Sequence, residues 1–414
     1  MPLNYVVRSQ VIIGATDLIS WMSERLKLIF VTAGSLAILT INAVAGSGPS
    51  IEVRFCPPSA VRTYPLESRR ELQSLLLQNV AVINHGSAAF KIDNVDIELL
   101  QSNRVIESRK LDRDAIQRIA ERGAKLQAAG VLQQVGFQFC GTDLIGPTIE
   151  LASPILNRDR ALLITSQVFA FSGMRDTLRV RVHGEVAGRP KEITGTLPVK
   201  SEFTKNTYKF PLRGTWFVGT GASFHTSHRW VIPQEFALDI AKLGSEGLTH
   251  KGDGTRFKDY YAYGADVLAA ANGRVISMVN DQPEDAAVMQ QPNESKEAYF
   301  ARLQKEQGER LAKGPTAITG NYVMIDHGKD EYSLYAHLQP GSVRVHIGDQ
   351  VKAGDAIGKL GSSGNSTEPH LHFHVCDRPN PLMCAGIPAN FSDVTIQWAD
   401  LPRPIQSGDV VISK

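Results

Sequence analysis

Three histidines alternate with apolar residues near the end of the chain, in the sequence His-Leu-His-Phe-His-Val that runs from His370 to Val375. Successive side chains of a β-strand point to opposite faces. A strand here would place His370, His372 and His374 on one face and the apolar residues on the other, in a core. Imidazole is the commonest transition-metal ligand near neutral pH. The segment therefore predicts a metal-binding or catalytic strand face, the alternative being a solvated face that is rich in histidine.

Two further segments supply candidate ligands and catalytic groups. The first contains His225, His228 and Asp239, and the second is a Tyr-Ala-His-Leu sequence that contains His337. Asp239 lies within an apolar stretch, where a carboxylate costs free energy unless it is paired or bound to a metal. Two histidines and one carboxylate, with a fourth position open to water, form a catalytic zinc site.

Taken together, these segments resemble the lysostaphin-type (LytM) zinc metallopeptidases over residues 206–414. The family pattern is a His followed by an Asp, then Tyr-Ala-His-Leu, then Pro-His-Leu-His-Phe. The chain matches the last two motifs at Tyr335–Leu338 and Pro369–Phe373. The segments Gly264–Val275 and Val343–Gly364 resemble the family's glycine-turned strands.

The resemblance implies one catalytic Zn²⁺ per chain, bound by His228, Asp239 and His372. It also implies that His337 and His370 face the substrate and the activated water rather than bind the metal. The activity that it implies is that of an endopeptidase acting on stem peptides or cross-bridges of peptidoglycan. A peptidase acting on proteins, and a non-catalytic activator or wall-binding protein, are the alternatives.

The chain departs from the family pattern around its first ligand. The first His and Asp of the family are often separated by three residues, whereas residues 229–238 lie between His228 and Asp239 here. This longer loop leaves His225 as an alternative metal ligand. His250 and Asp253 reproduce the short spacing, but they lie in a segment rich in glycine and lysine without a strand pattern.

The residues that follow the histidine strand carry further expectations. The position of His374 is often acidic in the family, so this side chain is expected either to contact a metal ligand from behind or to face solvent. Four cysteines behind an export signal favour two disulfides, which domain parsing alone assigns as Cys56–Cys140 and Cys376–Cys384. Because Cys376 would share the face of the histidines if the strand continued, it is also an alternative ligand.

The N-terminal segment, residues 1–45, predicts export. Arg25 and Lys27 precede an apolar run, Leu28–Ala45, that ends in Ala-Val-Ala. A basic region, an apolar region and a small-residue site are typical of a secretory signal, and an uncleaved anchor is the alternative. We therefore expect a location in the periplasm or cell envelope, with membrane contact only through this segment. The net charge of +2 favours no nucleic-acid partner, and we expect none.

The pattern of the remaining chain predicts a mainly β protein. Residues 50–205 are expected to form a β-sandwich-like accessory domain with one helix, from Asp112 to Ala129. Residues 206–414 are expected to form an antiparallel β peptidase domain with a polar helical insertion at 294–313. The insertion is expected to be a surface helix, with a lid or partner-docking element as the alternative.

Overall fold

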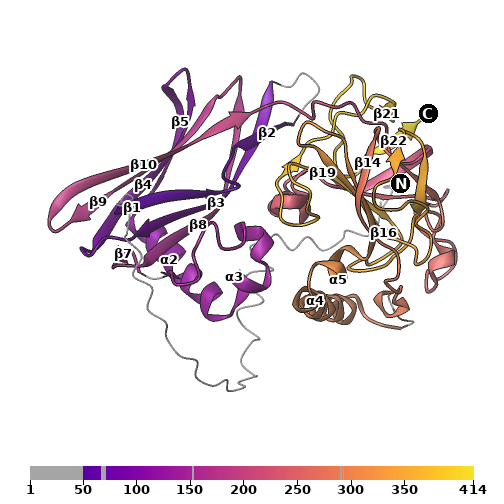
Figure 1. Cartoon of the computed structure of the whole chain (residues 1–414), viewed down its shortest axis with the longest axis horizontal. Helices are drawn as coiled ribbons and strands as arrows, with labels where there is room; N and C mark the ends of the chain where they lie inside the picture. Colours follow the sequence, from indigo (N-terminus) through magenta and orange to yellow (C-terminus); the bar gives the residue numbers. More distant parts are fainter. Residues whose placement is uncertain (1–49, 67–70, 152, 290, 292) are drawn as a thin grey trace, which may run out of the picture.

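The structure is a computed structural model of the 414-residue chain. It describes residues 50–66, 71–151, 153–289, 291 and 293–414. The predicted signal or anchor, residues 1–45, lies outside this part of the chain. Among the described helices, none has the length and apolar character needed to span a membrane. Figure 1 shows two β-rich halves, the first in indigo to magenta on the left and the second mainly in orange to yellow on the right.

The first half is built on one ten-stranded sheet with the order β5-β4-β9-β10-β2-β3-β8-β6, in which β1 also pairs with β3 and β7 with β4. Neighbouring strands are antiparallel except β10–β2 and β6–β8. In sequence order the strands are β1 (Ile51–Cys56), β2 (Val61–Pro65), β3 (Leu72–Asn84), β4 (Phe90–Gln101), β5 (Arg104–Leu111), β6 (Glu150–Leu151), β7 (Ile155–Leu156), β8 (Arg160–Ser172), β9 (Thr177–Val186) and β10 (Arg189–Lys200).

This sheet folds back on itself around an apolar core. Strands β10 and β1 cross so closely that a Cβ atom on Gly195 would lie 2.8 Å from the Cβ of Val53. The core contains buried side chains from both layers, among them Val80, Val95, Ile164 and Val180. The predicted mainly β class is confirmed, and the two layers of this half belong to one continuous sheet.

The predicted helix of the first half is present as α2 (Arg113–Ala128). The Asp112 side chain accepts a hydrogen bond of 2.9 Å from the backbone N–H of Ala115, which satisfies a donor of the first turn. Gly130 follows the helix with a φ of 70°, a conformation that glycine adopts without strain. Two short elements come next, the helix α3 (Val131–Gln134) and the 3-10 turn η1 (Gly136–Phe139).

The second half is built on an antiparallel sheet with the order β17-β14-β15-β16-β19-β12-β11-β22-β21, in which β20 also pairs with β19. Its strands are β11 (Gly214–Thr220), β12 (Leu238–Ala241), β14 (Gly273–Val279), β15 (Asn321–Asp326), β16 (Tyr332–Leu338), β17 (Gln350–Val351), β19 (Leu371–Cys376), β20 (Gly386–Ile387), β21 (Val394–Ile396) and β22 (Val410–Ser413). A separate pair is formed by β13 (Asp266–Leu268) and β18 (Ala356–Lys359).

The histidine strand β19 lies between β12 and β16. Its apolar residues Leu371, Phe373 and Val375 are buried in the main core of the second half, as the alternating pattern predicts. The register pairs His372 with Asp239 on one side and with Ala336 on the other. Because a slip of one residue would turn every side chain to the opposite face, burial of the apolar residues fixes where the histidines point.

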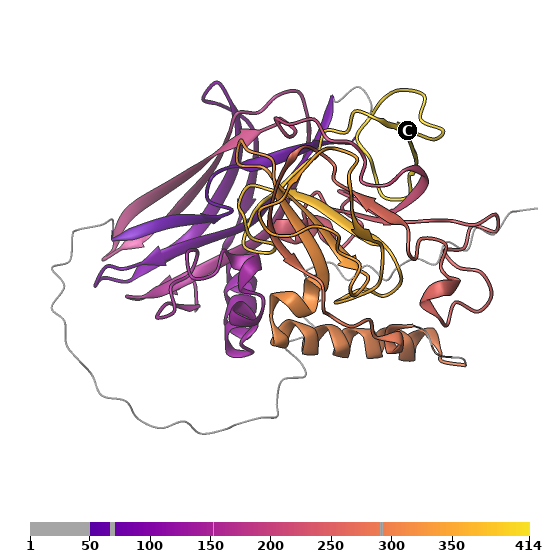
Figure 2. The same ribbon diagram turned by 45° about the vertical axis from the view of Figure 1, so that its right-hand side comes forward.

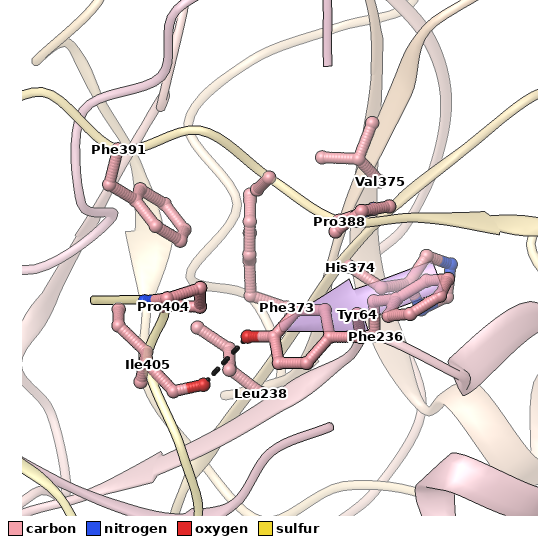
Figure 3. A pocket seen from close by; sticks show the side chains of 11 residues that line it. Tyr64, Phe236, Leu238, Phe373, His374, Val375, Pro388, Phe391, Pro404 and Ile405 are labelled. Atoms are coloured by element: carbon pink, nitrogen blue, oxygen red, sulfur yellow. Dashed lines mark hydrogen bonds between the residues drawn. The ribbon is translucent and has the colours of Figure 1, made fainter. Parts of the chain in front are cut away.

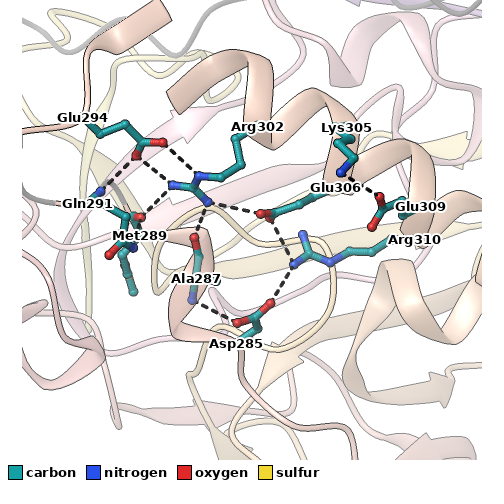
Figure 4. A network of polar contacts seen from close by, with 10 residues as sticks. All are labelled: Asp285, Ala287, Met289, Gln291, Glu294, Arg302, Lys305, Glu306, Glu309 and Arg310. Carbon is teal, nitrogen blue, oxygen red and sulfur yellow. Dashed lines mark hydrogen bonds and ion pairs between the residues drawn. The ribbon is translucent and has the colours of Figure 1, made fainter. Parts of the chain in front are cut away.

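The helical insertion between β14 and β15 contains α4 (Lys296–Lys313) and α5 (Pro315–Thr319), which follow the 3-10 turn η5 (Ala286–Val288). Figure 4 shows that polar contacts hold α4 against the chain before it. Arg302 donates to Glu294 at 2.9 Å and to the carbonyl oxygens of Met289 and Ala287. In Figure 2, α4 runs along the lower edge of the second half, toward the helices of the first.

Candidate active site

The carboxylate of Asp239 lies at the centre of a cluster of imidazoles. Its Oδ2 is 3.3 Å from Nε2 of His228, and its Oδ1 is 3.0 Å from Nδ1 of His372 and 3.5 Å from Nε2 of His370. The ligand atoms of His228, Asp239 and His372 all lie within 4.8 Å of one another. The structure thus brings the three predicted metal ligands together, although they come from a loop and two strands.

The geometry of these three residues fits a zinc ion. Tetrahedral zinc with bonds of 2.0–2.1 Å keeps its donor atoms about 3.3 Å apart, close to the two shorter separations from Asp239. The donor set, two imidazole nitrogens and one carboxylate oxygen, is that of catalytic zinc sites. On its other side, Nε2 of His372 is 2.9 Å from Nδ1 of His374, in the way that partners of ligating histidines fix the ring.

The loop that carries His228, residues 221–237, contains the 3-10 turns η2 (His228–Trp230) and η3 (Ile232–Gln234). Glu235 occupies the position that has the short family spacing before Asp239. Its Oε1 accepts a hydrogen bond of 2.8 Å from Nη1 of Arg229, so this carboxylate is engaged elsewhere. The longer loop therefore places His228 beside Asp239, in place of the residue at the short spacing.

The alternative ligands predicted from the sequence lie elsewhere. His225 is exposed and is not part of the ligand group at Asp239. His250 is buried against Tyr260, with ring centroids 5.3 Å apart. Asp253 is exposed and bonds to Thr255, so the short spacing of His250 and Asp253 builds no common site.

His337 and His370 are oriented by backbone carbonyl groups. Nδ1 of His337 is 2.8 Å from the Ser363 carbonyl oxygen, and Nδ1 of His370 is 2.7 Å from that of Glu368. A carbonyl oxygen only accepts hydrogen bonds, so each Nδ1 carries a proton. The Nε2 of His370 faces Asp239. The ring centroids of His337 and His370 lie 4.8 Å apart.

The backbone of His337 adopts a conformation that is rare for its residue type. Its φ is 65°, in the left-handed region that residues other than glycine seldom adopt. The carbonyl of His337 accepts from the N–H of Gly361 at 3.1 Å, and its ring is held by Ser363. Such local strain persists where surrounding contacts maintain it, often at functional sites.

Burial and charge set the protonation states of the site. Burial lowers the pKa of His228 to about 4. Burial alone would raise the pKa of Asp239, but the charges of His228 and His370 hold it well below its usual value. At neutral pH His228 is therefore neutral and Asp239 ionised, the forms in which these groups bind metal ions.

The remaining two catalytic candidates differ in electrostatic environment. Burial, reinforced by His370 and His372, holds the pKa of His337 well below its ordinary value. Burial acts to lower the pKa of His370 as well, but the charge of Asp239 and the hydrogen bonds around the ring raise it above the ordinary value. The site thus contains one imidazole that favours the neutral form and one that retains a proton more readily.

His374 is buried behind His372 rather than facing solvent. It is 2% exposed, and burial holds its pKa well below the ordinary value. Figure 3 shows it at the wall of a small cavity of about 30 Å³ between the halves, next to Phe236 and Tyr64. The hydroxyl of Tyr64 donates to the carbonyl of Ile405 at 2.8 Å across this boundary.

Both expected disulfides are present. Cys56 is bonded to Cys140 beside η1, and Cys376 to Cys384 directly after the histidine strand. Cys376 does lie on the histidine face, with its ligand atom within 4.8 Å of those of His374 and Cys384. Its sulfur is engaged in the disulfide, so in this form of the protein it is not an alternative metal ligand.

The turn that orients His337 contacts both ends of the helical insertion, an arrangement that the sequence motifs do not reveal. Glu284, before the insertion, accepts a hydrogen bond of 2.7 Å from the N–H of Ser362. Within α5, the carbonyl oxygen of Ile318 accepts a hydrogen bond from the N–H of Asn365 at 2.9 Å. Next to it, a Cβ atom on Gly320 would lie 2.5 Å from the carbonyl oxygen of Ser363. The insertion therefore supports the turn at residues 361–365, whereas a role as a lid or docking element stays a prediction.

Comparison with known proteins finds a family match within the second half of the chain. Residues 251–383 match the model of Peptidase family M23. The peptidoglycan DD-endopeptidase ShyA of Vibrio cholerae is 41% identical over 71 residues, which cover 17% of this chain and 16% of ShyA. The DD-carboxypeptidase/endopeptidase Mpg of Neisseria meningitidis is 44% identical over 70 residues, again 17% of this chain and 16% of the relative.

Two other similarities complete the comparison. The murein hydrolase activator EnvC of Escherichia coli is 43% identical over 56 residues, 14% of this chain and 13% of EnvC. The catalytic domain of lysostaphin from Staphylococcus simulans aligns with 45% of this chain and 95% of its own length, at 16% identity and a TM-score of 0.22. That score is too low to support a structural argument.

These matches are local. They span less than a fifth of the length of each of the three curated relatives, and the family match begins after His228 and Asp239. The motifs that contain His337, His370 and His372 lie inside it. The resemblance that these motifs predict is confirmed, because residues 251–383 match the model of Peptidase family M23.

Proposed function

We propose that this protein is an exported zinc endopeptidase that hydrolyses peptide bonds in the stem peptides or cross-bridges of peptidoglycan. The family match and the relatives named as peptidoglycan DD-endopeptidases support this proposal. The observation that carries it is the complete set of polar groups at one site. His228, Asp239 and His372 form the zinc donor set, and His337 and His370 lie beside it.

The residues of the site divide the chemistry among them. A zinc ion held by His228, Asp239 and His372 would lower the pKa of a water molecule to about 7 and polarise the scissile carbonyl. His337, neutral and with its Nδ1 proton held by Ser363, is the group that accepts the proton of the attacking water at Nε2. His370, whose pKa is raised, donates a hydrogen bond to the oxygen that gains negative charge.

The alternative from another class is a non-catalytic activator, which the similarity to EnvC favours. An activator needs neither a zinc donor set nor two oriented imidazoles next to it. Both are present here, and His337 keeps an unfavourable backbone conformation at the site. This combination favours the enzyme.

The test is digestion of purified sacculi by the purified full chain, with zinc content measured in the same preparation. We expect one zinc per chain and soluble muropeptides whose masses identify the cleaved bond. A chelator should abolish the release, and added zinc should restore it. The His337→Ala variant is the matched control, because it removes a side chain that binds no metal.

Three results would contradict the proposal. Zinc-loaded protein that releases nothing from sacculi, yet stimulates a separate murein hydrolase, would identify an activator. Cleavage of an unfolded protein such as casein together with intact sacculi would identify a peptidase with protein substrates. Absence of bound zinc after reconstitution would exclude the metal site itself.

A further inference from the structure

The segment that carries the first metal ligand is built into the boundary between the two halves of the chain. We propose that Gln138 and Gln78, both in the first half, are positioning residues that hold His228 in its place beside Asp239. This inference rests on the proposed zinc site. It assigns to the first half a direct part in forming a site whose ligands all come from the second half.

The residue directly after the ligand is the first part of this boundary. Arg229 has no solvent exposure, and its guanidinium donates to Glu235 at 2.8 Å. The guanidinium carbon also lies 4.9 Å from the ring centroid of Phe236 and 5.9 Å from that of Tyr64, a residue of β2. A charged side chain in such a place is retained only with a fixed partner, so the backbone next to His228 has little freedom.

Gln138, in η1, makes two hydrogen bonds to the backbone of the loop. Its Nε2 donates to the carbonyl of Trp230 at 2.7 Å, and its Oε1 accepts from the N–H of Ile232 at 3.0 Å. One side chain thus pairs with an acceptor at the end of η2 and with a donor at the start of η3, in the manner of a neighbouring strand. The η1 turn is itself fixed, because Asn79 of β3 donates to the Gln138 carbonyl at 2.7 Å.

Gln78, in β3, reaches the residue next to the ligand. Its Nε2 donates to the carbonyl of Arg229 at 3.1 Å, and the side chain is 1% exposed. Ile232, four residues after His228, is buried in the apolar cluster around α3 and η1, where it packs with Val135 and Phe139. The loop therefore contacts the first half through backbone hydrogen bonds and an apolar side chain together.

These contacts matter because the loop lacks a strand neighbour at this point. His372 and Asp239 are held by β-ladders on both sides, whereas His228 lies in a single 3-10 turn. A ligand on a loop is less well positioned than one on a strand unless its surroundings hold it. The first half supplies those surroundings.

The test compares Gln138→Leu with Gln134→Leu in the full chain. Gln134 is the matched control: it lies four residues earlier in the same half and donates, at 3.4 Å, to Gly308 of the insertion instead of the loop. We expect Gln138→Leu to weaken zinc binding by about tenfold or more, the usual effect of losing a residue that supports a ligand. Zinc affinity is measured by competition with a chromogenic chelator.

A second readout does not require the metal. In the metal-free protein, Gln138→Leu should speed amide hydrogen exchange in residues 226–235 while that of β19 stays unchanged. If Gln138→Leu fails to fold, Gln78→Met replaces it, because it removes the hydrogen bonds of Gln78 to Arg229 and to Gln138 and keeps the side-chain volume. Zinc affinity and loop exchange equal to those of the control would overturn the inference. Wild-type protein that binds no zinc would instead overturn the proposed function, and faster loop exchange in Gln138→Leu would still support the positioning role.

Discussion

His372 makes polar contacts through both ring nitrogens, to Asp239 at Nδ1 and to His374 at Nε2. This ring is therefore fixed both toward the proposed metal and behind it. We predict that His372→Ala abolishes stoichiometric zinc binding, because it removes one of three protein ligands. Metal analysis of the purified variant checks this, with thermal unfolding to show that it is folded. A variant that keeps its full zinc content would refute the ligand assignment.

His337 has the opposite predicted profile. It lies 5.8 Å from His372 between ring centroids but is not one of the three proposed ligands. His337→Ala should therefore keep zinc and lose turnover by roughly 100-fold or more, the usual effect of removing a general base or oxyanion donor. Steady-state kinetics on a soluble muropeptide, with zinc content in parallel, measure this. Near-normal turnover would show that the assigned role is incorrect.

The buried pair of Arg229 and Glu235 allows a prediction about stability. Burial raises the pKa of Glu235 to about 6 even though Arg229 opposes the shift, so the carboxyl group is still mainly ionised at pH 7. Removing one member leaves the other charge buried, at a cost of about 3–5 kcal/mol. We expect this loss in the unfolding free energy of Glu235→Gln, measured with urea.

The double variant Arg229→Met with Glu235→Leu is the control for that measurement. Apolar replacement of a whole buried pair is often neutral, so it should recover most of the loss. A single variant as stable as the wild type would contradict this prediction, because it would show that water reaches the remaining charge.

Sequence reasoning could identify the site residues that belong to short motifs. The alternation around His372 and the apolar surroundings of Asp239 are local signals. Gln138 and Gln78 carry no such signal, because an amide that bonds to a backbone 92 or 151 residues away has no pattern in its own segment. The choice between His228 and His225 has no local signal either, because it depends on how the loop at residues 221–237 returns to β12.

At the scale of elements, the turn at residues 361–365 connects the helical insertion to His337. We predict that Gly320→Ala lowers kcat by about 10- to 100-fold with zinc content unchanged, since small displacements of catalytic groups have effects of this size. The added methyl group would meet Ser363, whose carbonyl orients His337. Kinetics on a soluble muropeptide, with zinc analysis, measure the effect.

Gly314 provides the matched control for this substitution. It lies in the same insertion and also has a positive φ, of 100°, but a Cβ atom there would have no neighbour within 4 Å. Gly314→Ala therefore reproduces the backbone strain without the contact. Equal activities of the two variants would show that the contact between the insertion and Ser363 does not affect His337.

Element boundaries were predictable where capping residues mark them. Asp112 and Gly130 bound the region of α2, and the insertion predicted at 294–313 contains α4, which begins after its cap Ser295. The contacts between elements were harder to predict from the sequence. The ends of the insertion meet the 361–365 turn through the Glu284 carboxylate, the Ile318 carbonyl and the close approach of Gly320. These contacts depend on the tertiary arrangement and not on residue type alone.

At the scale of the whole molecule, export and oxidation are the predictions to test. Mass spectrometry of the exported protein should find a new N-terminus near Gly46, after the Ala-Val-Ala sequence, and no free thiols. The two disulfides in the structure account for all four cysteines. An intact N-terminus would favour the anchor, and a free thiol at Cys376 would contradict the pairing.

The mainly β class and its two β-rich regions follow from strand patterns and one family resemblance. The close boundary between them does not, because it consists of single side chains such as Arg229 and Tyr64 whose partners lie in distant segments. Sequence patterns report the period of an element and its caps. They do not report which surfaces of two regions fit together.

His228 lies in the second half but is held by residues of the first, so the order in which the chain is synthesised affects when the site forms. A chain is made and translocated from its N-terminus, and its domains fold as units in that order. The residues that hold His228 emerge early, whereas His370 and His372 lie within the last 45 residues of the 414. Zinc binding would therefore be among the last steps in the maturation of a newly exported chain. On the proposed export route, a peptidase assembled in this order would stay inert until the strand that carries His372 had crossed the membrane.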